Sequence, residues 1–168
     1  MTKKEIIQLV RQHISDEQAT AFTEGGNLEE PAGTKELIIY LDRAVDAYSR
    51  RQVSAGDIRL LKEAALKNGD LLPVDFLAFA GNVPISVVHG YVRWFYPFAG
   101  GERRTARYFA RLPYVSAYGD NDALDYQHDQ EIAIAALAAI YALNKHEANV
   151  SQDLMLLGMG EANANTGQ

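Results

Sequence analysis

The longest apolar segment of the chain is a run of twelve residues from Ile132 to Leu143, placed between charged flanks. Alanine, which has the best helix propensity, recurs throughout this run. The run is shorter than the about 20 apolar residues that a membrane span requires. Because it is apolar on every side, it predicts a central, buried helix, which Asp125 and Asp129 near its start and Lys145 near its end would favour through the helix dipole.

Helical spacing of apolar residues also marks the N-terminal part of the chain. Thr2 and Glu5 have the spacing of a capping box, and apolar residues then recur at helical intervals as far as Ile14. A second amphipathic helix is expected to begin at the cap Thr34 and to continue through Tyr48. We interpret both apolar stripes as core.

The segment that follows predicts further short helices. Asp57 is placed to cap a third helix from Ile58 to Lys67, which Asn68-Gly69 would end. After Pro73, which suits the first turn of a helix, residues 76–79 form a short apolar turn. These elements continue the helical pattern of the first half of the chain.

From Val83 the composition shifts to β-branched and aromatic residues, which favour strands. We expect one strand over residues 84–96 and a second over residues 103–112. Gly100 and Gly101 supply the turn between them, so the two strands would form a β-hairpin.

These elements together define the predicted fold class. It is mainly α, a helical bundle around the buried, alanine-rich C-terminal helix, with one inserted β-hairpin at about residues 85–112. A chain of 168 residues has the length of one domain. We therefore expect a single domain over residues 1–158, with a short last helix after Ser151, and a flexible tail over residues 159–168.

Composition narrows the possible functions. The chain has no cysteine, which excludes a disulfide framework, a thiolate metal site and a cysteine nucleophile. Its formal net charge of −6 argues against a dedicated nucleic-acid-binding protein, although a local basic patch would still act. No cofactor is expected. The sequence also lacks a nucleophile elbow, a zinc-protease motif and a dinucleotide-binding fingerprint, so no catalytic residue is assigned.

An acidic cluster precedes and begins the apolar helix. A calcium loop would use Asp120, Asp122 and Glu131, but Leu124 and Asp125 stand where that loop needs a ligand and a glycine. An acidic first turn that favours the helix dipole explains the cluster better, and no metal site is assigned. The cluster consists of Asp120, Asp122, Asp125, His128, Asp129 and Glu131.

A basic, aromatic cluster lies on the predicted hairpin. Arginine mixed with aromatic residues is typical of protein interfaces and of single-strand nucleic-acid platforms. Because the whole chain is acidic, we favour a subunit or partner interface. Its residues are Arg93, Trp94, Arg103, Arg104, Arg107, Tyr108 and Arg111.

Several segments follow one another in a characteristic order. They are a helix carrying Glu36 to Ala44, then Leu72-Pro73-x-Asp75-Phe76, a strand ending in Phe95-Tyr96-Pro97, the segment Arg107 to Pro113, and an alanine-rich helix ending in Ala142 to Lys145. Over about Thr34 to Gly158, this order resembles the head-to-tail adaptor (connector) proteins of tailed bacteriophages.

The resemblance implies a structural virion protein at the head–tail junction, made in the host cytoplasm. Subunits would form a ring, typically of twelve copies, below the portal protein. The ring would extend the DNA channel to the next tail or nozzle protein, and DNA would pass through its lumen without sequence-specific binding. The family's C-terminal segment commonly contacts the portal, which maps here onto Ser151, Leu154, Met155, Leu157 and Met159.

Three hypotheses thus follow from the sequence. The first is the adaptor ring, in which the arginine-rich hairpin would face the acidic loop Glu24 to Glu30 of a neighbouring subunit. The alternative is a nucleic-acid-binding module that uses the same hairpin, with an affinity that falls steeply with salt. The third is a metal-assisted hydrolase using Asp120, Asp122 and His128.

Overall fold

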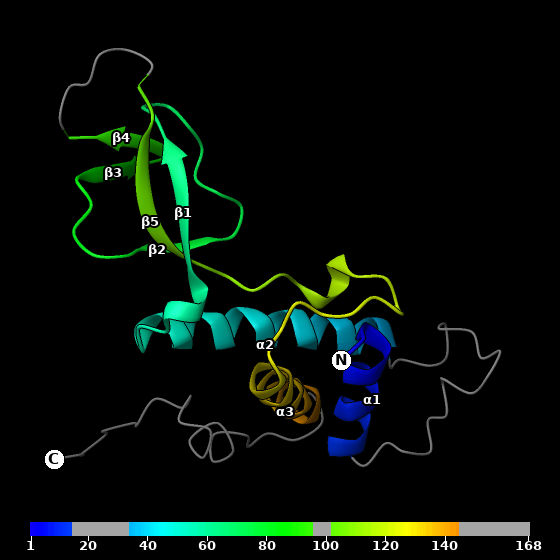
Figure 1. Cartoon of the computed structure of the whole chain (residues 1–168). Helices are drawn as coiled ribbons and strands as arrows, with labels where there is room; N and C mark the ends of the chain where they lie inside the picture. Colours follow the sequence, from blue (N-terminus) through cyan, green and yellow to red (C-terminus); the bar gives the residue numbers. More distant parts are fainter. Residues whose placement is uncertain (15–33, 96–101, 145–168) are drawn as a thin grey trace, which may run out of the picture. The chain divides into compact units, whose positions relative to one another are not determined.

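The computed structural model describes residues 1–14, 34–95 and 102–144 (Figure 1). The chain divides into two compact units. We call residues 1–48 with 114–168 the helical unit, and residues 49–113 the β unit. The predicted C-terminal helix after Ser151 and the predicted tail over residues 159–168 lie outside the described residues.

The helical unit contains α1 (Lys3–His13), most of α2 (Thr34–Ser54), the 3-10 turn η2 (Val115–Ala117) and α3 (His128–Asn144). The predicted capping box is confirmed, since the Thr2 hydroxyl accepts from the Glu5 N–H and the Glu5 carboxylate accepts from the Thr2 N–H. Helix α2 includes Thr34 as its first residue, where Thr34 was expected as the cap before it, and it continues beyond Tyr48 to Ser54. The core of this unit joins Ile6, Ile7, Val10, Leu41, Val45, Ile134 and Leu137, all fully buried.

The first residues of the chain pair with the segment before α3. The Leu124 N–H donates to the Met1 carbonyl at 2.9 Å, and the Lys4 N–H donates to the Asp120 carbonyl at 3.1 Å. Thr2 and Ala123 form an antiparallel bridge. The segment leading into α3 is therefore held by backbone hydrogen bonds to the start of α1.

Helix α3 buries only one side. Leu137 and Ala138 are buried, whereas Ile132 is 44 % exposed and Leu143 is 39 % exposed. The prediction of a helix buried all round is therefore wrong. Apolar residues on every side allow a central helix, but α3 has packing partners on one side among the described residues, so the other side remains at the surface.

The β unit contains two antiparallel sheets, one with the strand order β1-β5-β2 and one formed by β3 and β4. Its core is a cluster of Leu66, Ile85, Val92 and Ala106, against which Trp94 packs. The strands are β1 (Leu61–Leu66), β2 (Phe76–Phe79), β3 (Ile85–Val88), β4 (Tyr91–Trp94) and β5 (Arg104–Ala110), and the short 3-10 helix η1 (Ile58–Leu60) precedes β1.

The predicted fold class is wrong. The described residues form three helices and five strands, with 46 % helix and 24 % strand, which is a mixture of α and β rather than a mainly helical bundle. The third helix expected over residues 58–67 is η1 followed by β1, and the turn expected over residues 76–79 is β2. The segment Leu61–Leu66 contains good helix formers, but all six of its residues pair with β5, and this pairing overrides that local preference.

The predicted hairpin over residues 85–112 is also wrong. β3 pairs with β4 across a two-residue turn, His89-Gly90, and β5 pairs with β1 and β2 instead. Both turn residues have positive φ, 53° for His89 and 83° for Gly90, which is the conformation of the tight hairpin turns that match strand twist. The expected single strand over residues 84–96 is therefore itself a complete hairpin.

Candidate interaction surface

Two of the predicted interface residues pack within the β unit: Tyr108 is buried and Trp94 is partly buried. The Trp94 ring N–H donates to the Leu66 carbonyl at 3.2 Å, and its backbone N–H donates to Oδ1 of Asn68 at 2.7 Å. Tyr108 is 6 % exposed and its ring stacks on Phe76. These two aromatic residues hold the β unit together rather than forming an outer surface.

Tyr108 forms part of a small polar group on the three-stranded sheet. Its hydroxyl donates to Oδ1 of Asp75 at 3.2 Å, and the Lys62 ammonium lies 2.7 Å from Oδ2 of the same carboxylate. Burial raises the pKa of Asp75, but the hydrogen bonds and charge of Lys62, with Tyr108, outweigh it and leave the pKa lowered. Burial and the Asp75 charge raise the pKa of Tyr108. The group is thus an ionised carboxylate that two donors stabilise.

Two predicted interface arginines lie next to acidic residues of their own unit. Arg103 Nη1 lies 3.5 Å from Asp70, and Arg107 Nε lies 2.9 Å from Glu63 on the neighbouring strand β1. Both arginines are more than half exposed, so these pairs contribute little to stability. They do, however, reduce the positive charge that each arginine presents.

The remaining predicted arginines lie at different places in the β unit. Arg93 is exposed on β4, and Arg104 is exposed at the start of β5. Arg111 is half-buried beyond the end of β5, and its backbone N–H donates to the Asp75 carbonyl at 2.7 Å. The structure therefore does not collect the five arginines into one patch on a single hairpin.

Arg93 lies beside a row of exposed apolar residues. Val88 and Tyr91 are register partners in the β3–β4 hairpin, and Leu71 forms a bridge with Tyr91 on its other side. Partners directly opposite one another share a face of a sheet, and Arg93 shares it with Tyr91 because residues two apart along a strand do. The exposed fractions are 39 % for Val88, 48 % for Tyr91 and 63 % for Leu71. We call Leu71, Val88, Tyr91 and Arg93 the hairpin face.

The other side of the β3–β4 hairpin, opposite the hairpin face, packs into the core of the β unit. Val92, between Tyr91 and Arg93 in sequence, is fully buried, and Ile85 is 9 % exposed. The alternation along β4 therefore gives a packed side and an outer side, and the outer side carries large apolar residues where polar ones are usual. The sequence predicted Arg93 as an interface residue but did not indicate Leu71 or Val88. These three residues come together only through the pairing of β3, β4 and the segment that contains Leu71.

Exposed apolar side chains concentrate in the β unit. In the described part of the chain ten large apolar side chains are exposed, and seven of them lie in residues 49–113. A contiguous group of such side chains marks an interaction surface, whereas single scattered ones do not, so the hairpin face is the candidate among them. The seven are Ile58, Leu71, Val74, Val87, Val88, Tyr91 and Phe95.

The two units also differ in charge. Residues 49–113 contain ten Lys and Arg and five Asp and Glu, a formal charge of +5. The other residues contain six Lys and Arg and seventeen Asp and Glu, a formal charge of −11. The overall charge of −6 therefore conceals a basic β unit and an acidic helical unit.

The acidic cluster before α3 is used within the helical unit. Asp122 Oδ2 accepts from the Gly119 N–H at 2.7 Å, and Asp120 lies 3.7 Å from the Lys3 ammonium. No group of three or more His, Asp or Glu side chains in the described residues is arranged to hold a metal ion. The hypothesis of a metal-assisted hydrolase at Asp120, Asp122 and His128 thus has no geometric support there.

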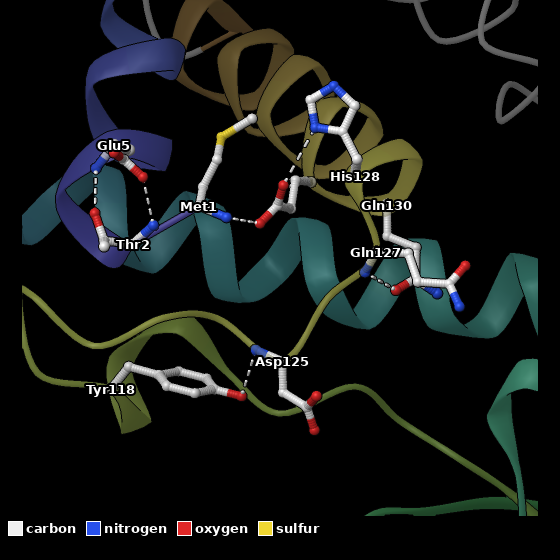
Figure 2. A network of polar contacts seen from close by, with 9 residues as sticks. Met1, Thr2, Glu5, Tyr118, Asp125, Gln127, His128 and Gln130 are labelled. Carbon is white, nitrogen blue, oxygen red and sulfur yellow. Dashed lines mark hydrogen bonds and ion pairs between the residues drawn. The ribbon is translucent and has the colours of Figure 1, made fainter.

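Glu131 is the most buried acidic residue of this cluster, with 3 % of its surface exposed. Its carboxylate pairs with the Met1 amino group, and Nδ1 of the exposed His128 lies 3.5 Å from it (Figure 2). Figure 2 also shows the Tyr118 hydroxyl accepting from the Asp125 N–H. The pair with Met1 ties the start of α3 to the start of the chain, so we assign Glu131 a structural role.

Other predicted residues fall outside the described part of the chain. They are the acidic loop Glu24 to Glu30 and the portal-contacting residues Ser151, Leu154, Met155, Leu157 and Met159. Among the described residues, no helix has both the length and the apolar character needed to cross a membrane.

Comparison with known proteins adds no assignment: no family model, curated protein or solved structure matches this chain. The candidate site therefore depends on the geometry and charge of the β unit.

Proposed function

We propose that this chain is a head-to-tail adaptor subunit of a tailed bacteriophage, a structural virion protein that forms a ring below the portal. The observation that carries the proposal is the hairpin face, an exposed apolar row ending in Arg93 on a β unit that interrupts a helical unit in the sequence. A subunit whose partners lie on several sides needs such a surface outside its own core.

The order of sequence segments is the reason for proposing the adaptor family in particular. The separation of charge between the two units supports the assembly of subunits. A basic unit and an acidic unit in one chain give complementary surfaces, which orient partners and exclude wrong ones. The ring of twelve copies, the portal contact, the contact with the next tail protein and the passage of DNA through the lumen all belong to this proposal.

The test is the mass of the purified protein alone and after mixing with portal rings from tailed phages, measured by light scattering on a sizing column. We expect a complex with a portal ring. The variant Leu157→Asp should lose that complex, whereas Ala164→Asp, which adds the same charge nearby, should retain it. A protein that binds no portal ring would contradict the proposal.

A second candidate function is binding of single-stranded nucleic acid, which the +5 charge of the β unit favours. Binding to phosphates releases counterions, so the affinity for an oligonucleotide would fall steeply as salt is raised. Fluorescence anisotropy with a labelled oligonucleotide at several salt concentrations tests it. Absence of binding at low salt would remove this candidate.

A further inference from the structure

A second exposed apolar surface lies on α3. Asp129, Ile132, Ala136, Ile140 and Leu143 follow one another at intervals of three or four residues, so they share one side of the helix. Ile132 and Leu143 are exposed, and Ala136 and Ile140 are half-buried. We call these five residues the α3 stripe. It has an acidic residue at its N-terminal end and apolar residues after it.

The α3 stripe and the hairpin face have matching compositions. Each is an apolar row with one exposed charged residue, Asp129 on the stripe and Arg93 on the hairpin face. Each also belongs to the unit of its own sign, −11 for the helical unit and +5 for the β unit. Apolar area supplies affinity, and the opposite charges supply orientation and a faster encounter.

We infer that the hairpin face of one copy of this chain binds the α3 stripe of a second copy, in a contact that joins two different surfaces of the same protein. Such a contact leaves one free hairpin face and one free α3 stripe on every dimer, so it repeats until a ring closes or a filament grows. The inference rests on the proposed function in that it names the contact between ring subunits. It differs from the sequence-based hypothesis, which paired the arginines with the loop Glu24 to Glu30.

The first experiment is sedimentation velocity of the full chain over a wide range of protein concentration. At low salt we expect assemblies larger than a monomer. At about 1 M salt, where charges are screened within about 3 Å, the association should be weaker. A chain that is monomeric at every concentration in low salt would overturn the inference.

Charge reversal identifies the two surfaces. Arg93→Glu and Asp129→Arg should each weaken self-association at least about tenfold, because like charges would then face one another. Lys35→Glu and Glu102→Arg change the net charge equally and lie on exposed residues outside both surfaces, so they should associate like the unaltered chain. Circular dichroism of all four variants separates loss of contact from loss of fold. Folded Arg93→Glu or Asp129→Arg proteins that associate normally would contradict the inference.

Mixing the two variants tests that the contact is between different surfaces. The Asp129→Arg chain retains an intact hairpin face, and the Arg93→Glu chain retains an intact α3 stripe. Together they should assemble, although each alone associates weakly. In one contact Arg93 faces Asp129, and in the other the glutamate introduced at position 93 faces the arginine introduced at position 129, so both pairs have opposite charges. A mixture that stays monomeric would overturn the inference. Leu71→Ser and Ile132→Ser should each weaken self-association, and their mixture should form a dimer that does not grow, because its second contact would lack both apolar side chains. Ile58→Ser is the exposed apolar control.

Portal binding by the same variants separates this inference from the proposed function. If the mixed variants fail to assemble but the chain binds portal rings, the self-contact is wrong and the adaptor proposal stands. If they assemble and no portal is bound, the self-contact stands alone. If Leu71→Ser abolishes portal binding while self-association is unchanged, the hairpin face belongs to the portal and the inference is overturned.

Discussion

The Tyr108 hydroxyl donates a hydrogen bond of 3.2 Å to the Asp75 carboxylate, which joins β5 to the residue just before β2. Lys62 on β1 binds the other oxygen of that carboxylate. The three strands of the larger sheet are therefore connected through one ionised side chain in addition to their backbone pairing.

Removing the Tyr108 hydroxyl tests the contribution of this connection. Tyr108→Phe retains the ring that stacks on Phe76 and should lower the free energy of unfolding by about 1 kcal/mol, the usual net value of one intramolecular hydrogen bond. Urea denaturation followed by circular dichroism measures it. Tyr91→Phe, at a residue 48 % exposed, is the matched control and should change stability little. Equal effects at the two positions would show that the Asp75 contact contributes nothing.

The same carboxylate gives a pH dependence. The pKa of Asp75 is lowered in the folded protein, so the unfolded chain binds more protons than the folded chain as pH falls below about 4. Asp75 should therefore stabilise the fold fully at neutral pH and lose this contribution in acid, as pH falls through the folded pKa. Denaturation midpoints at a series of pH values measure the effect. Asp75→Asn should be less stable at neutral pH and should lose less stability in acid; parallel curves for both proteins would refute this.

Two leucines of α3 test the assignment of its buried and exposed sides. Leu137 is 1 % exposed and Leu143 is 39 % exposed. Leu137→Ala should cost about 2–5 kcal/mol of unfolding free energy, as large-to-small changes in a packed core do. Leu143→Ala should cost less than about 1 kcal/mol, because surface substitutions have small effects. Chemical denaturation of both variants measures these changes in the free energy of unfolding. Similar losses of stability in the two variants would mean that α3 is buried all round.

The capping box at the start of α1 makes a local prediction. Thr2→Ala removes the hydroxyl that accepts from the Glu5 N–H and should cost about 1 kcal/mol. Gln8→Ala, at an exposed position in the middle of α1, should be neutral or slightly stabilising, since alanine is the better helix former. Thermal unfolding monitored at a helix wavelength compares them. A Thr2→Ala protein as stable as the Gln8→Ala protein would contradict the cap assignment.

Local signals in the sequence were sufficient for the three helices. Thr2 with Glu5, Thr34, and the apolar run from Ile132 each act within a few residues through caps, dipoles and side-chain spacing, and α1, α2 and α3 lie where these signals place them. The β unit was not recovered, because strand pairing joins residues far apart in sequence. Leu61–Leu66 has helical propensity and becomes a strand only because β5 pairs with it.

The candidate interaction surface was likewise predictable from the sequence only in part. Composition alone predicted a subunit or partner interface of arginine and aromatic residues near β4 and β5, and among these residues Arg93 is exposed. Register and packing decided which residues face outward. They bury Tyr108, pack Trp94 partly buried against the core, and align Leu71 with Tyr91 and Val88. A one-residue change of register moves every side chain of a strand to its other face. The sequence by itself thus determined where α1, α2 and α3 lie and the total charge. The tertiary structure decided that residues 61–66 form a strand, how the strands pair, how charge is separated between the units and which face is exposed.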